Sequence, residues 1–75
     1  MIESEIKEII RSALPDAEVS IQDLNGLGNH LRLEVASVEF RGLSRIACHK
    51  KVQDLFESQL ADGSLHALSL KTIEK

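Results

Sequence analysis

The fold is decided by the stretch Leu65-His66-Ala67-Leu68-Ser69-Leu70-Lys71-Thr72, which alternates at positions 66, 68, 70 and 72. It follows Asp62-Gly63-Ser64, and such clusters are typical of turns. Short alternating segments bounded by turn residues are typical of strands, so we predict a strand here. A helical pattern precedes this stretch, and an apolar strand precedes that helix. The stretch therefore closes a strand–helix–strand crossover, and we expect it to pair in parallel with the earlier strand.

The segment before this strand has the pattern of one long helix. Ser44 is the candidate N-cap, because its hydroxyl can accept a hydrogen bond from a free backbone N–H. Asp62-Gly63 is the expected end of the helix. We expect the helix to lie across the sheet, and Cys48 to be a small core residue, because one arc of the helical wheel holds Cys48, Val52, Leu55, Phe56 and Leu60.

The first half of the chain predicts a helix followed by a hairpin. Isoleucines recur at helical spacing from Ile2 to Ile10, and Pro15 stops this pattern. Alternation then predicts a strand over 17–22, a glycine-containing loop over 25–29 and a returning strand over 31–35. The tail over 36–40 loses the alternation.

The element order is thus helix–strand–strand–helix–strand, which predicts an α+β fold. We expect a three-stranded mixed sheet, covered on one face by both long helices, in a single domain over 1–75. The residues predicted for the core are Ile6, Ile10, Val19, Leu33, Val52, Phe56 and Leu68.

Composition excludes several classes of protein. The net charge of −3 argues against a dedicated nucleic-acid binder. A single cysteine, Cys48, excludes an internal disulfide and an all-cysteine metal site, and it suits a reduced cytoplasmic or mitochondrial-matrix setting. No apolar run approaches the roughly 20 residues that span a bilayer, so no membrane association is expected. The pattern shows no catalytic triad, acid pair or phosphate loop, so we do not expect an enzyme.

Two of the three histidines are expected to meet at one rim of the sheet. His30 opens the second strand and His66 opens the third, and parallel strands begin at the same end. His49 lies early in the crossover helix, which starts at the opposite end, so it should be distant from both. Taken alone, His30 and His66 are ordinary polar rim residues, and His49 is a structural histidine near the sheet.

Four segments together resemble the BolA family. They are Gly28-Asn29-His30-Leu31, Phe40-x-Gly42-x-Ser44, His49-Lys50-Lys51-Val52 and the stretch from Leu65 to Thr72. The resemblance implies a fold similar to class II KH domains, without their Gly-x-x-Gly clamp. It also implies that the protein, a monomer without cofactor when alone, forms a heterodimer with a monothiol glutaredoxin around a shared [2Fe–2S] cluster. The glutaredoxin cysteine and glutathione would complete that site, in cluster assembly, trafficking or redox regulation.

The resemblance also assigns cluster ligands. It implies that the histidine of the last strand, His66, binds iron, and imidazole is a known cluster ligand. Many relatives supply a second ligand from a Cys or His in the hairpin region, but the loop over 25–29 contains neither. His30 borders this loop and is the nearby substitute.

An alternative function is that of a small DNA-binding transcriptional regulator. Its candidate surface comprises the basic residues of an acid-free segment over 40–53, together with one histidine: Arg41, Arg45, His49, Lys50 and Lys51. The four cations spread around the helix and do not form one stripe, so an ordinary solvated face, or a docking surface for an acidic partner or glutathione, is the simpler interpretation. We expect weak, non-specific nucleic-acid binding at most.

Overall fold

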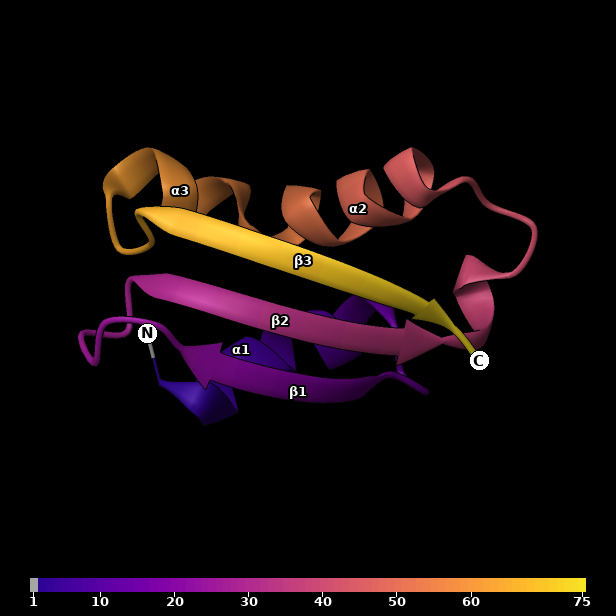
Figure 1. The fold of residues 1–75 in the computed structure, drawn as a ribbon, viewed down its shortest axis with the longest axis horizontal. Coiled ribbons are helices and arrows are strands. Elements are labelled where there is room, and N and C mark those ends of the chain that lie inside the picture. The colour runs from indigo at the N-terminus through magenta and orange to yellow at the C-terminus, as the bar shows by residue number, and fades with distance from the viewer. Residues whose placement is uncertain (1) are drawn as a thin grey trace.

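The computed structural model describes residues 2–75, which fold into a three-stranded sheet covered by helices on one face (Figure 1). Strand order is β1-β2-β3, with β1 antiparallel and β3 parallel to the central β2. This confirms the predicted α+β fold with a mixed sheet. The elements in chain order are α1 (Glu3–Ala13), β1 (Glu18–Asp23), β2 (His30–Ser37), the 3₁₀ turn η1 (Val38–Phe40), α2 (Arg45–Gln53), the 3₁₀ turn η2 (Asp54–Phe56), α3 (Glu57–Asp62) and β3 (Ala67–Glu74). No helix within residues 2–75 has both the length and the apolar character needed to cross a bilayer.

Helix α1 forms as its pattern predicts. Ile6 and Ile10 are buried against the sheet, while Glu3 and Glu5 place carboxylates in the first turn, where the helix dipole favours them. The helix ends before Pro15, and the N–H of Leu14 donates to the carbonyl of Ile10 at 2.8 Å. The ring of a proline disfavours helical geometry in the preceding residue, which explains this boundary.

Strand β2 is the centre of the sheet and remains regular for longer than the sequence suggested. Leu31, Leu33 and Val35 are buried, and the alternation continues to the buried Ser37. The strand therefore runs two residues past the predicted 31–35, and the rest of the predicted irregular tail, Val38–Phe40, leaves the strand as η1. Ser37 continues the phase of Leu31, Leu33 and Val35 but is polar, and its hydroxyl donates to Asp16 at 2.8 Å, which allows it to be buried.

Asp16 joins the start of β1 to the turn that follows β2. Its second carboxylate oxygen accepts the N–H of Val38 at 2.8 Å. This backbone hydrogen bond, assisted by the Ser37 hydroxyl and the nearby Lys75, holds the pKa of the Asp16 carboxyl below its ordinary value of 3.8. Lys75 also donates to the carbonyl of Asp16 at 2.7 Å. This hydrogen bond connects the residue after β3 to the segment just before β1.

The crossover is divided into three segments, so the single long helix predicted from the wheel was wrong. Ser44 caps α2 as predicted, accepting the N–H of Ala47 at 3.1 Å, and Gly63 ends α3 with a positive φ of 83°. Between them the chain tightens into η2, which ends at Phe56. The two helix types differ by only about 15–20° in ψ, and an apolar pattern carries no information on so small a difference.

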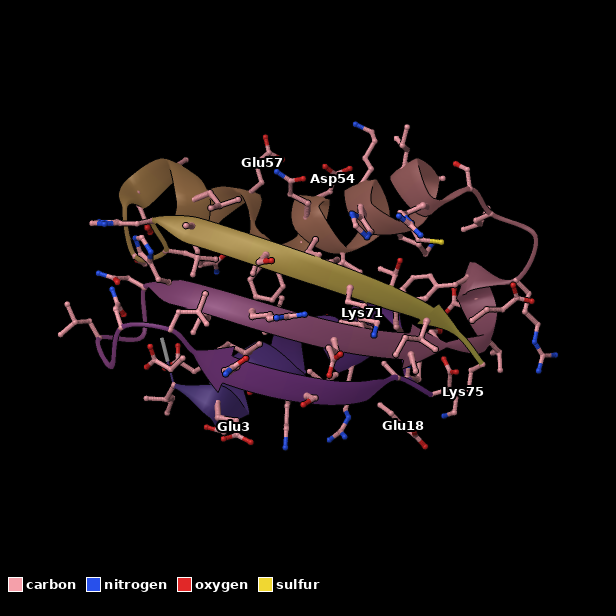
Figure 2. All side chains as sticks on the ribbon, viewed as in Figure 1. Glu3, Glu18, Asp54, Glu57, Lys71 and Lys75 are labelled. Carbon is pink, nitrogen blue, oxygen red and sulfur yellow. The ribbon has the colours of Figure 1, made fainter. Side chains whose placement is uncertain are left out.

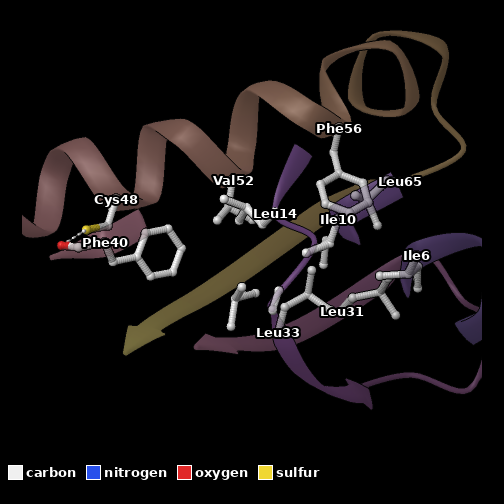
Figure 3. Packing of buried hydrophobic residues seen from close by; sticks show 12 residues of the cluster. Ile6, Ile10, Leu14, Leu31, Leu33, Phe40, Cys48, Val52, Phe56 and Leu65 are labelled. Carbon is white, nitrogen blue, oxygen red and sulfur yellow. Dashed lines mark hydrogen bonds between the residues drawn. The ribbon is translucent and has the colours of Figure 1, made fainter. Parts of the chain in front are cut away.

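The core lies between this crossover, α1 and the inner face of the sheet (Figure 3). Five of the seven predicted core residues are buried: Ile6, Ile10, Leu33, Val52 and Phe56. Cys48 is buried as well, which confirms its prediction. Val19 and Leu68 pack against the core but are only half-buried, because they belong to the two edge strands.

Strand β3 begins two residues later than predicted, at Ala67, because the N–H of Leu65 still bonds to the carbonyl of Gln59 in the preceding turn. Its ladder to β2 starts with the N–H of Ala67 and ends with that of Lys75, which donate to Asn29 and Ser37. Backbone groups alternate in direction along a strand. The odd-numbered residues thus face β2, and residues 68, 70, 72 and 74 direct their N–H and C=O groups to the free edge.

Candidate functional site

His30 and His66 lie side by side at the rim where β2 and β3 begin. The parallel register pairs His30 with Ala67, which places His66 immediately next to that pair. One carbonyl, that of Asn29, accepts the N–H of His66 at 2.7 Å and the N–H of Ala67 at 3.1 Å. The expectation that these two histidines share one rim is therefore confirmed.

The two imidazole rings lie in a T-shaped, edge-on arrangement. Their centroids are 6.1 Å apart and their planes meet at 66°, with His66 exposed and His30 half-buried. Imidazole nitrogens bind metals at about 2.0–2.1 Å, so a metal held between two rings separates their centroids by at most roughly 6.5 Å. The observed spacing lies within that limit.

The rim offers two imidazoles as potential metal ligands. Across residues 2–75 there is no group of three or more His, Cys, Asp or Glu side chains placed to hold a metal ion. A metal or cluster needing four ligands would take the others from a second molecule. This arrangement differs from a closed structural metal site, where one chain provides every ligand.

The loop before His30 is held by a side chain that the sequence analysis did not single out. The Asp23 carboxylate accepts the N–H groups of Asn25, Gly26 and Gly28 at 3.3, 2.9 and 3.0 Å. Gly26 and Gly28 have φ values of 75° and 74°, which favour glycine. An Asp two residues before Asn-Gly is a common turn signal and could have identified this contact. The loop therefore presents His30 from a fixed backbone.

The same loop exposes apolar side chains next to the histidines. Leu24 and Leu27 are 55% and 74% exposed, and Leu24 is tied to the rim because its N–H donates to the carbonyl of His30 at 2.8 Å. The rim thus combines two potential ligands with an apolar border.

His49 lies elsewhere, as expected. It is half-buried on α2 and lines a hollow beside β3 with Arg45 and Thr72. Thr72 is five residues along β3 from Ala67, or about 16–17 Å at 3.3 Å per residue. His49 is therefore not part of the rim pair.

The basic residues of the acid-free segment do not share a surface. Lys50 extends to Asp54 at 3.9 Å, Arg41 donates to the carbonyl of Lys75, and Arg45 lines the hollow beside β3. Figure 2 shows Asp54 on the crossover and Lys75 beside Glu18 at the far end of the sheet. Three of the four cations therefore lie in different surroundings.

The fold and the rim define a small α+β domain with a paired-histidine edge, and comparison with known proteins identifies its family. Residues 4–75 match the family described as BolA-like protein, so the chain belongs to the BolA-like family. It is 36% identical over 69 residues to an uncharacterized protein of Rickettsia prowazekii, covering 92% of this chain and 88% of that one.

Solved structures agree with this assignment. BolA1 from Arabidopsis thaliana has a TM-score of 0.82 and 27% identity, covering 93% of this chain and 87% of that chain. The BolA domain of SufE1, from the same plant, has a TM-score of 0.80 and 29% identity, with the same coverage of both chains. The domain architecture described above is therefore that of the BolA-like family.

Proposed function

We propose that this protein is a non-catalytic adaptor that partners a monothiol glutaredoxin around a shared [2Fe–2S] cluster, in cluster assembly, trafficking or redox regulation. In this proposal His66 is a ligand to the cluster and His30 is the second. A cytoplasmic or mitochondrial-matrix setting belongs to the same proposal, because glutathione and the partner's cysteine complete the site.

The observation that carries the proposal is the 6.1 Å spacing of the His30 and His66 rings at an exposed rim. Two imidazoles can replace two thiolates on one iron of a [2Fe–2S] cluster, as in Rieske centres. The rim holds two candidate ligands of one type and leaves room for a partner. Such a donor set fits a cluster shared between two proteins better than one enclosed by a single chain.

The chain's own residues have distinct tasks in this arrangement. Asp23 fixes the loop, and the Asn29 carbonyl fixes the backbone of His66 against β2. The side chain of His66 is then free to turn toward the partner. Leu24 and Leu27 offer apolar area that a partner would cover. A cluster bound here would supply one-electron redox chemistry at a potential raised by imidazole ligation.

The DNA-binding alternative receives less support. Its candidate residues lie in different surroundings. Two of the cations already interact within the chain, because Lys50 pairs with Asp54 and Arg41 donates to the carbonyl of Lys75. Duplex recognition uses a basic stripe or patch that can track the phosphates. The net charge of −3 opposes such binding as well.

The decisive experiment mixes the purified protein with a cluster-loaded monothiol glutaredoxin and glutathione, and records visible absorption and circular dichroism. We expect a new spectrum from mixed ligation. The His66→Ala variant should abolish it without loss of fold, because His66 is exposed and outside the core.

Matched variants separate the parts of the proposal. Arg11→Ala, an exposed change on α1, should leave the spectrum unchanged. His30→Ala tests the second ligand, and an unchanged spectrum would remove His30 from the site. If wild-type protein does not alter the glutaredoxin spectrum, the adaptor function itself is wrong. If His66→Ala behaves like wild type, the ligand assignment is wrong although a heterocomplex exists.

A further inference from the structure

A second candidate site lies between α2 and β3, remote from the histidine rim. A hollow of about 260 Å³ is lined there by Arg45, His49, Leu70, Lys71 and Thr72. Arg45 and His49 are four residues apart, so they share one face of the helix. A smaller hollow of about 170 Å³ adjoins it, sharing Arg45 and Thr72 and including Glu74.

The charges around this hollow are unequally paired. The ammonium of Lys71 lies 3.7 Å from a carboxylate oxygen of Glu34, so a residue of the chain already offsets its charge. Within residues 2–75, neither Arg45 nor His49 has a carboxylate within 4.0 Å. An unpaired guanidinium and an imidazole therefore face one concave surface, in a chain whose net charge is −3.

The donors at this place suit an oxyanion. A guanidinium presents a planar fork of N–H groups that matches carboxylate and phosphate geometry, and an imidazole adds one or two more donors. Thr72 contributes from β3, because even-numbered residues of this strand direct their backbone N–H to the free edge. Side chains from a helix and backbone from a strand thus converge from two sides.

We propose that Arg45 and His49 form a binding site for an oxyanion, a carboxylate or a phosphate, carried by a small molecule. The size of the hollow favours this class, because it is below the roughly 300–1,000 Å³ of pockets that hold drug-sized ligands. A polymer would need neighbouring cations in line, and Lys50 is engaged with Asp54 instead. The site lies about 16–17 Å along β3 from the rim. It does not depend on the proposed cluster function.

The test uses sulfate, inorganic phosphate and succinate as probes in separate titrations, followed by the backbone amide resonances of the ¹⁵N-labelled protein. We expect saturable shifts centred on Arg45, His49 and Thr72 with at least one probe. Arg45→Ala should weaken binding about tenfold, the usual result of losing one charge-assisted pair. Because Arg45 is exposed, this variant should keep its fold, which the amide spectrum itself reports.

A second variant tests the imidazole. His49→Ala removes one of the two side-chain donors from the hollow. Sulfate binding should weaken in this variant, and the double variant with Arg45→Ala should show no saturable shift. An unchanged sulfate affinity in His49→Ala, with a native amide spectrum, would overturn the proposed pair.

The probes and variants also decide between sources of the anion. Tighter binding of phosphate and sulfate than of succinate assigns a phosphorylated ligand, and the reverse assigns a carboxylate. Absence of any saturable shift overturns the proposal. An equal loss in Arg11→Ala, an exposed change on α1, would show non-specific attraction and overturn it too. The proposal is also overturned if a DNA duplex binds through the same residues, at physiological salt, more tightly than every small probe.

Discussion

Truncation of Phe56 is the sharpest test of how this small core is built. Phe56 is fully buried, with 0% of its side chain exposed, and Figure 3 shows it beside Ile10 of α1 and Leu65 before β3. It therefore joins the crossover to both the first helix and the last strand. Phe56→Ala should cost about 3–5 kcal/mol of the free energy of unfolding, from lost apolar burial and the cavity left behind.

This cost is large for a chain of 75 residues. At about 0.05–0.15 kcal/mol per residue, the total stability is roughly 4–11 kcal/mol. The variant should therefore lie close to its unfolding transition at 25 °C, or be partly unfolded. Few alternative contacts exist to compensate, because a chain this small buries a lower fraction of its surface than larger domains do.

Urea unfolding followed by far-UV circular dichroism measures the effect. Phe56→Leu keeps most of the volume and should cost less than about 1.5 kcal/mol. Leu55→Ala changes the half-buried neighbour and should cost less than Phe56→Ala. A loss below about 1 kcal/mol for Phe56→Ala, at an unchanged dependence on urea, would refute this account of the core.

Four further predictions follow from particular contacts. Ser44→Ala removes the cap of α2 and should cost about 1 kcal/mol in the same urea assay, whereas no loss would mean that water replaces the cap. The lowered pKa of Asp16 means that its hydrogen bonds stabilise the fold above pH 3.8 and that this contribution is lost as pH falls below that value. Asp16→Asn should therefore show a smaller fall in stability between pH 5 and pH 3 than wild type, and an equal fall would contradict it. In the proposed heterocomplex, His66→Cys should lower the cluster potential in a redox titration, since thiolate replaces imidazole, and an unchanged or raised potential would argue against ligation by His66. Duplex DNA should bind weakly and lose affinity steeply with added salt, and nanomolar sequence-specific binding at physiological salt would favour a regulator instead.

The sequence specified the sheet more completely than it specified the helices. The alternation in β3 and its turn cluster predicted a parallel partner for β2, and with it the meeting of His30 and His66. The prediction of the sheet succeeds because the alternation of apolar residues sets the register of a strand, and the type of connection sets its direction. The division of the crossover at η2 was not predictable, because the apolar arc is compatible with both helix types.

Contacts between residues distant in sequence were also beyond prediction. The burial of Ser37 depends on Asp16, 21 residues earlier in the chain, through a hydrogen bond that no periodic pattern encodes. The hollow beside β3 was missed for a related reason. Arg45 and His49 were recognised as part of a basic segment, but which cations are already paired becomes clear only once Lys50 and Lys71 are placed.

The free edge of β3 has a consequence for self-association. Four residues of this strand offer unpaired backbone groups along an edge that contains no proline, and such an edge is a template for intermolecular sheet formation. Charged side chains discourage this pairing, but here they are confined to the later half, at Lys71 and Glu74. The first half, from Ala67 to Leu70, carries none, so growth of an aggregate would begin there. This half adjoins His66, so a partner docked at the rim would lie over the unprotected segment. Occupancy by the partner and colloidal stability of the protein should therefore rise and fall together.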